Sequence, residues 1–142
     1  MRVSLTAIVV WSVFASSSAW SLSAVAIGLP DDVAKGGFAM GIARNYGTQG
    51  QADSEALQQC LGFKDAPDST RALCKIVLRF ANQCFAVAMD PEPGTPGVGY
   101  RTATMQSDAD YGATMDCKQT SQYDRANFCK VTYRVCDVTK SN

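Results

Sequence analysis

The chain contains the stretch Cys74-Lys75-Ile76-Val77-Leu78-Arg79-Phe80 and, later, the related stretch Cys129-Lys130-Val131-Thr132-Tyr133-Arg134-Val135. Both open with a cysteine and carry lysine and arginine at matching positions. Apolar residues at every second position predict a β-strand. Alternation places Ile76, Leu78 and Phe80 opposite Lys75, Val77 and Arg79, and Val131, Tyr133 and Val135 opposite Lys130 and Arg134.

These two strands belong to a longer internal repeat, in which residues 41–60 align with residues 98–117. Six of those twenty aligned pairs are identical: Arg44/Arg101, Gln49/Gln106, Ala52/Ala109, Asp53/Asp110, Ala56/Ala113 and Cys60/Cys117. About one identity is expected by chance between unrelated segments, so the repeat indicates two related structural units. We therefore expect two strand–helix–strand halves that bury their apolar faces in one shared core.

Other patterns complete the predicted fold. Phe38, Met40 and Ile42 alternate with small residues and predict a strand over 38–43, whereas helical spacing predicts a helix from 51 to 61. A strand over 85–89, a proline-rich loop over 90–97, a strand over 98–105 and a helix from about 107 to 117 follow. We predict an α+β fold, in which an antiparallel sheet carries two helices on one face.

The start of the chain is typical of a secretory leader. Arg2 precedes a short apolar run over 3–14 and then small residues, the layout of a signal peptide. Cleavage after Ala19 fits the distance from the apolar run, and cleavage after Ala26 fits the Ala-x-Ala pattern better. We predict a signal peptide over 1–26, an arm over 27–35, one domain over 36–137 and a tail over 138–142. The run is shorter than the roughly 20 apolar residues that span a bilayer, so we expect no membrane anchor in the mature form.

All six cysteines follow the predicted leader: Cys60, Cys74, Cys84, Cys117, Cys129 and Cys136. An even number in a small exported domain predicts three disulfides. A thiolate metal site is disfavoured because the chain lacks Cys-x-x-Cys spacing and histidine. Six cysteines allow 15 connectivities. Equivalence of the halves favours Cys60–Cys74 and Cys117–Cys129, which leaves Cys84–Cys136 to join the halves.

Composition excludes several functional classes. Thirteen basic residues balance thirteen acidic ones, so net charge predicts no nucleic-acid affinity. The chain has no histidine, which excludes a Ser-His-Asp or Cys-His site, and no phosphate-binding glycine motif, so we expect no cofactor and no metal. Carboxylate pairs can hydrolyse a glycoside, and the candidates are Asp53 with Glu55, or Asp108, Asp110 and Asp116. Their places near helix starts are explained equally by the helix dipole.

Basic residues provide the main candidate binding surface. If the two related strands are neighbours in one sheet, Lys75, Arg79, Lys130 and Arg134 share its outer face, with Arg44 and Arg101 nearby. Such a face could dock an acidic protein or an acidic envelope polymer. It is also what a solvated sheet needs in order to resist strand-to-strand aggregation.

The cysteine order and the segment Asn82-Gln83-Cys84-Phe85-Ala86-Val87-Ala88 give the chain a family resemblance over residues 36 to 137. The chain resembles the bacterial domain of unknown function family 4189. The resemblance implies an exported, disulfide-bonded, alanine-rich domain in a Gram-negative bacterium, hence a periplasmic or secreted location. It implies no activity and no catalytic residues.

Two functions are compatible with these patterns. The first is a non-catalytic exported binding domain, such as an inhibitor or immunity-type partner of an envelope-acting enzyme. The second is a small carboxylate-dependent hydrolase of cell-wall or glycan substrates. Missing catalytic groups favour the first, so we expect a protein that is not an enzyme.

Overall fold

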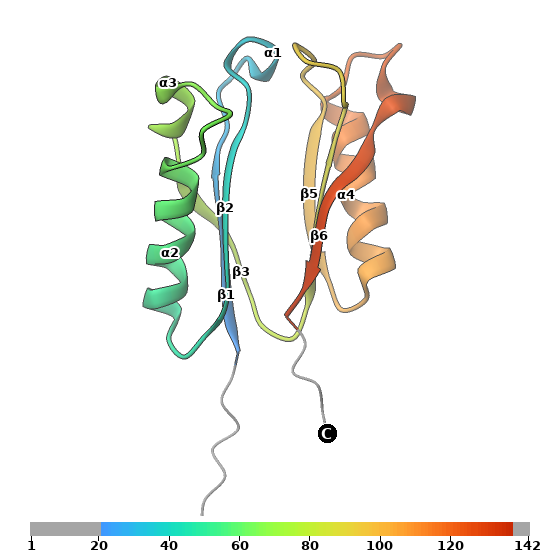
Figure 1. Cartoon of the computed structure of the whole chain (residues 1–142). Coiled ribbons are helices and arrows are strands. Elements are labelled where there is room, and N and C mark those ends of the chain that lie inside the picture. Colours follow the sequence, from blue (N-terminus) through green and yellow to red (C-terminus); the bar gives the residue numbers. More distant parts are fainter. Residues whose placement is uncertain (1–20, 138–142) are drawn as a thin grey trace, which may run out of the picture.

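The computed structural model describes residues 21–137 and has four layers, helix, sheet, sheet and helix (Figure 1). The first half comprises β1 (Leu22–Gly28), β2 (Ala39–Tyr46), α2 (Gln49–Leu61) and β3 (Lys75–Phe80). The second half comprises β4 (Cys84–Met89), β5 (Val98–Ala103), α4 (Gln106–Thr120) and β6 (Lys130–Cys136). Three short helices lie in connections: α1 (Val33–Gly36), α3 (Asp68–Arg71) and η1 (Ala126–Phe128). Most of the predicted leader and the predicted tail over 138–142 lie outside the described residues.

The strands form two antiparallel three-stranded sheets, with orders β2-β1-β3 and β5-β4-β6. The predicted α+β class is confirmed. The structure differs from the expected arrangement because it has two sheets rather than one, and each long helix covers the outer face of its own sheet (Figure 1). Each half is therefore a strand–strand–helix–strand unit with its own central strand, β1 or β4.

Strand β1 is the element that the sequence prediction lacked. It pairs with both β2 and β3, and its residues from Ser23 to Ile27 are at most 1% exposed. In place of the loose arm expected over 27–35, the structure has the end of β1 and the short helix α1. The central strand of the first sheet thus begins inside the segment predicted as leader.

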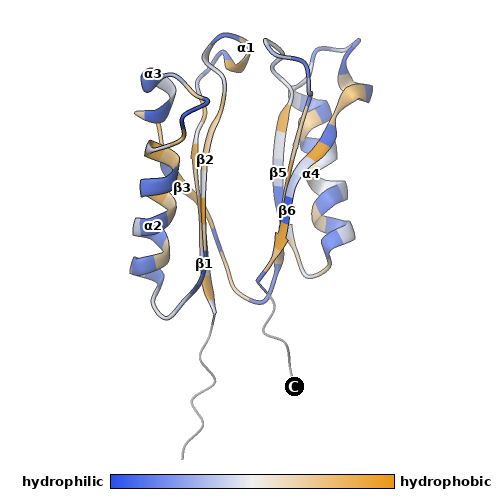
Figure 2. Cartoon of the chain, in the orientation of Figure 1, coloured by the Kyte–Doolittle hydropathy of each residue, from blue (hydrophilic) through white to orange (hydrophobic). Residues whose placement is uncertain are grey.

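The two faces of each sheet are packed differently. The helix-facing sides bury mostly alanines, including Ala24 and Ala26 in the first half and Ala86 and Ala88 in the second. The inner faces bury larger side chains against each other, among them the predicted strand face of Phe38, Met40 and Ile42. In Figure 2 the hydrophilic colour follows the two outer helices, and hydrophobic segments lie on the strands between them. The main core therefore lies between the two halves.

Glycines allow each helix to approach its sheet closely. A Cβ atom added to Gly41 would lie 2.0 Å from the carbonyl oxygen of Ala56 on α2. A Cβ atom added to Gly99 would lie 2.3 Å from the carbonyl oxygen of Ala113 on α4. Real Cβ atoms do not make such contacts, so only glycine fits at these two equivalent positions.

A bulge in β3 and another in β6 change the predicted alternation. In β3, Leu78 pairs with Val25 and Ile76 pairs with Ala26, which leaves Val77 as an extra residue. An extra residue reverses the faces beyond it. Ile76 therefore packs against the helix layer and Leu78 against the other sheet, so the prediction that they share one face is wrong. Strand β6 has the same bulge at Thr132.

All three predicted disulfides are confirmed: Cys60–Cys74, Cys117–Cys129 and Cys84–Cys136. The first two bind the end of each long helix to the start of the following strand. The third joins β4 to β6, so it lies within the second half and does not connect the halves as expected.

Each half has two connections at the same end of the molecule, and we call this end the loop end. These connections follow β1, α2, β4 and α4, and comprise residues 29–38, 62–74, 90–97 and 121–129. The start of β1 and the end of β6 lie at the opposite end (Figure 1). There the buried carboxylate of Asp137 accepts hydrogen bonds from the hydroxyls of Ser21 and Ser23, the latter at 2.5 Å.

Candidate binding cleft

The predicted basic residues do not form one surface. Strands β3 and β6 belong to different sheets, so Lys75 and Arg79 are separated from Lys130 and Arg134. Register also separates each pair, because Arg79 lies opposite Ala24 on the helix side while Lys75 lies opposite Ile27 on the inner side. The four basic residues therefore do not share one face of one sheet.

Two of these arginines attach a helix to its sheet. The Arg79 guanidinium donates to both carboxylate oxygens of Asp53 on α2, at 2.9 to 3.1 Å. The hydrogen bond from Arg79 holds the pKa of Asp53 below its usual range. In the second half, Arg134 lies 3.2 Å from Asp110 on α4. Both arginine side chains remain more than half exposed.

A glutamine completes each of these sites, which we call the Gln–Asp–Arg clusters. Gln49 donates to Asp53 at 2.9 Å and to the carbonyl of Ser23 at 3.4 Å. Gln106 donates to Asp110 at 2.7 Å and to the carbonyl of Phe85 at 3.4 Å. The identities Gln49/Gln106, Asp53/Asp110 and Arg79/Arg134 in the repeat therefore have a shared structural cause, attachment of the helix start to the sheet.

Arg44 and Arg101 do not occupy equivalent places. Arg101 lies opposite Ala86 on the helix side and binds Asp116 of α4 at 2.5 Å. In the first half, Ala43 holds the corresponding position opposite Ala24. Arg44 is exposed at an irregularity of the β1–β2 pairing, so its alignment with Arg101 is wrong by one residue.

The candidate catalytic carboxylates lie along the outer helices. Asp53, Asp110 and Asp116 are engaged by arginines, Glu55 accepts a hydrogen bond from Gln59, and Asp108 is exposed. Asp53 and Glu55 both lie on α2, and Asp108, Asp110 and Asp116 all lie on α4. The ion pairs of Asp53, Asp110 and Asp116 give these three carboxylates a structural role in attaching the helices to the sheets.

A cleft of about 620 Å³ opens at the loop end between the two halves. One wall comes from α1, the start of β2 and the segment after α2; the other comes from the end of β4, the 90–95 loop and β6. Its apolar lining includes Val33, Phe38, Met40, Phe63, Val87, Met89, Pro91, Pro93 and Tyr133. The volume is within the range typical of ligand pockets, and both halves contribute to it.

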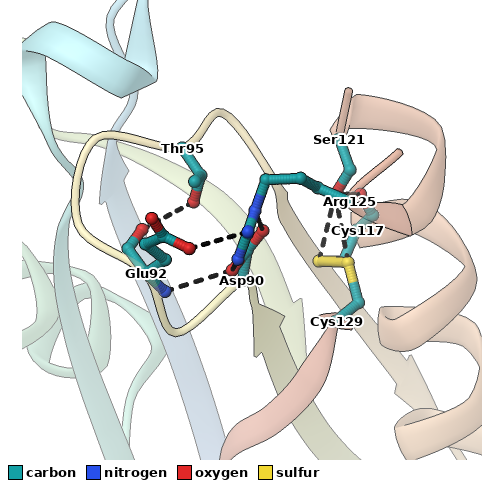
Figure 3. A network of polar contacts seen from close by, with 7 residues as sticks. All are labelled: Asp90, Glu92, Thr95, Cys117, Ser121, Arg125 and Cys129. Carbon is teal, nitrogen blue, oxygen red and sulfur yellow. Dashed lines mark hydrogen bonds and ion pairs between the residues drawn. A yellow bond between two sulfur atoms is a disulfide. The ribbon is translucent and has the colours of Figure 1, made fainter. Parts of the chain in front are cut away.

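A buried ion pair holds the wall formed by the 90–95 loop (Figure 3). The Asp90 side chain is fully buried, and Arg125 donates to its two oxygens from Nε at 2.6 Å and Nη2 at 2.8 Å. This hydrogen bonding holds the pKa of Asp90 below its usual range. Arg125 also binds Glu92 at 2.7 Å and stacks over Phe128 at 4.6 Å.

The loop that supplies Arg125 is itself fixed next to the disulfide Cys117–Cys129 (Figure 3). Ser121 donates to the carbonyl of Cys117 at 2.8 Å, and its hydroxyl lies 3.2 Å from the Cys129 sulfur. The proline-containing loop closes through hydrogen bonds from the Asp90 amide to Gly97 and from the Thr95 hydroxyl to Glu92. The second half thus presents a preformed wall.

The opposite wall is held by a helix cap and by a contact between two connections. The Asp32 carboxylate accepts a hydrogen bond from the Lys35 amide at 3.2 Å and caps α1, and Gly37 leaves the helix with φ of +68°. The buried hydroxyl of Thr70 donates to the Gly36 carbonyl and joins α1 to the α2–β3 connection. The cleft therefore lies between the hairpin loops β1–β2 and β4–β5, which are equivalent in the repeat.

The side chains of this cleft determine what chemistry it can support. Its side chains are mainly apolar, and two of its three acidic groups, Asp90 and Glu92, already bind Arg125. Within residues 21–137, no group of three or more potential metal ligands is close enough to hold an ion. Sequence reasoning missed the cleft, because loops from two halves form it. The available signals were the proline-rich loop and the methionines at strand ends.

Comparison with protein families assigns residues 23–136 to the domain of unknown function DUF4189. The chain belongs to the DUF4189 family. The DUF4189 match includes β1, so it starts earlier than the resemblance over residues 36 to 137 indicated. Comparison of this DUF4189 chain with curated proteins and with solved structures found no match. Between residues 21 and 137, no helix has the length and hydropathy required to cross a bilayer.

Proposed function

We propose that this DUF4189 protein is a non-catalytic exported binding domain that holds its ligand in the loop-end cleft. The observation that carries the proposal is a mostly apolar cleft of about 620 Å³ built by both halves. A well-formed apolar pocket with a few polar groups is the most common form of ligand-binding site in proteins. A wall secured by a buried ion pair and a neighbouring disulfide is preorganised, which lowers the entropic cost of binding.

The three disulfides are consistent with a protein that works outside the cytoplasm. The leader-like start and three disulfides are typical of proteins from oxidising compartments, so we propose a periplasmic or secreted location. An inhibitor or immunity-type partner of an envelope-acting enzyme is one form that such a binding domain could take.

The hydrolase alternative has less support. Its candidate acids, Asp108, Asp110 and Asp116, all lie on α4, and none of them lines the cleft. An acidic partner docked on the basic residues stays a prediction, but its original basis, a shared outer face, is missing.

Probe binding tests the proposal. The neutral apolar dye N-phenyl-1-naphthylamine should become fluorescent with the wild-type protein, and Tyr133→Ser in the cleft should weaken its binding several-fold. Tyr111→Ser is the matched control, because this tyrosine is 70% exposed on the outer helix α4. Equal binding by both variants and the wild type would contradict the cleft assignment. Release of soluble fragments from peptidoglycan, lost in Asp110→Ala, would favour the hydrolase instead.

A further inference from the structure

The charged groups around the cleft indicate what kind of ligand it accepts. We propose that the ligand is a polypeptide segment of a partner protein, in which an apolar side chain lies next to lysine or arginine. This inference rests on the proposed function, because it assumes that the cleft is the binding site.

Charge at the cleft is acidic overall. Among its lining residues, Asp65, Asp90 and Glu92 oppose Lys35 alone. Lys35 is paired with Asp32 at 3.2 Å and its side chain is 87% exposed. The three acidic groups and one basic group among the lining residues give a formal charge of −2. A cationic ligand complements this charge, whereas an acidic ligand would be repelled.

The interior of the cleft suits apolar side chains of varied shape. Met40 from the first sheet and Met89 from the second both line it, together with Phe63 and Tyr133. Methionine side chains are flexible and polarizable, and they adapt to different apolar ligands. Acidic groups around an adaptable apolar interior fit an apolar side chain flanked by basic ones.

Large apolar side chains are also exposed elsewhere at the loop end, which favours a polypeptide over a small molecule. Four large apolar side chains that do not line the cleft are 46% or more exposed in the loop-end connections or at their edges: Leu61, Leu73, Tyr123 and Phe128. A small molecule would fill the cleft and leave these side chains in water. A protein segment with its parent surface can cover both.

Three capped ten-residue peptides test this inference on the oxidised protein. The first has two phenylalanines between lysines, the second replaces its lysines with glutamates, and the third replaces its phenylalanines with serines. Amide chemical shifts should change in 33–40, 63–67 and 89–95 with the first peptide and much less with the others. Asp65→Asn should weaken binding of the first peptide about two- to fivefold, the range for exposed charge pairs. Asp108→Asn, on the outer helix, should leave it unchanged.

Each other result has a defined meaning. Equal binding of the lysine and glutamate peptides would overturn the inferred charge preference but leave the cleft as a binding site. If the neutral dye binds but none of the three peptides does, the polypeptide ligand is overturned and a small apolar molecule is favoured. Concentration-dependent shifts of the same amides without peptide would replace the partner with a second copy of this chain. Failure of dye and peptides alike would remove the proposed function as well.

Discussion

Arg79 of β3 binds Asp53 of α2 through two guanidinium nitrogens, with Nε at 3.0 Å and Nη2 at 2.9 Å from Oδ2. The equivalent pair in the second half, Arg134 and Asp110, makes one contact at 3.2 Å. The sequence analysis predicted these two arginines as part of a docking surface. In the structure, each of them attaches a helix to a sheet. Bidentate arginine–carboxylate pairs are stronger than single contacts, so the two halves should differ in how tightly their helices are held.

Replacement of Arg79 by alanine should lower the melting temperature by about 2–4 °C, and replacement of Arg134 by less than half as much. The difference follows from the number of hydrogen bonds lost. Thermal unfolding followed by circular dichroism measures both, with Lys75→Ala as the control on the same strand, because Lys75 is exposed. Equal losses from Arg79, Arg134 and Lys75 would show that the clusters contribute no more than general surface charge.

Substitution of alanine for Gly41 or Gly99 should destabilise the protein by more than about 2 kcal/mol, since each Cβ would meet helix backbone that cannot move independently. The matched control is Gly47→Ala, where nothing lies within 4 Å of the added atom. Its stability should change by less than about 0.5 kcal/mol. Urea unfolding measures all three; a mild effect at Gly41 would mean that α2 packs farther from the sheet than described.

Loss of Arg125 should leave the buried Asp90 carboxylate without its cation. Arg125→Ala should lower the melting temperature at pH 7 by more than about 5 °C, because an unpaired buried charge is strongly destabilising. Glu92→Gln, which alters only the exposed partner of Arg125, should have a much smaller effect. Comparable losses in the two variants would contradict the assignment of Asp90 as the main partner.

The same ion pair predicts how stability depends on pH. Arg125 lowers the pKa of Asp90 in the folded state from its ordinary 3.8. A carboxyl group whose pKa is lower in the folded state than in the unfolded state stabilises the folded state at any pH above its unfolded pKa. This stabilisation is lost as the pH falls through the pKa of the folded state. The wild-type melting temperature should therefore drop below about pH 4, and Arg125→Ala should show a smaller drop, in scans between pH 2 and pH 6. Parallel pH profiles would refute the pairing.

The sequence was sufficient to predict those parts of the fold that depend on the spacing of apolar residues within one element and on the internal repeat. Equivalence of the halves was sufficient to pair Cys60 with Cys74 and Cys117 with Cys129, because a short loop joins each helix to its next strand. Bulges were not predictable, since the apolar residues around Val77 and Thr132 fit a regular strand equally well. The register shift they cause is what turned Ile76 and Leu78 to opposite faces.

Strand β1 was missed for a different reason. Its sequence, Leu22-Ser23-Ala24-Val25-Ala26-Ile27-Gly28, has no alternation of apolar and polar residues, because a central strand with covered faces needs none. It also matches the small-residue pattern of a cleavage site. The segment Ala86-Val87-Ala88-Met89 in β4 is its counterpart, and an extension of the repeat toward the start of the chain could have found it.

The position of β1 favours one of the two predicted cleavage sites. Cleavage after Ala26 would remove Leu22 to Ala26 from the middle of the first sheet, along with Ser21 and Ser23, which bind the buried Asp137 carboxylate. Cleavage after Ala19 retains all of them. We therefore expect removal of the predicted leader to give a chain that begins at Trp20, as measured by intact mass and N-terminal sequencing after expression with the leader in a bacterial host. A chain made to begin at Ile27 should fail to give a cooperative melt, whereas one beginning at Trp20 should melt cooperatively. A folded mature chain that starts at Ile27 would show that β1 is dispensable and would require a different first sheet.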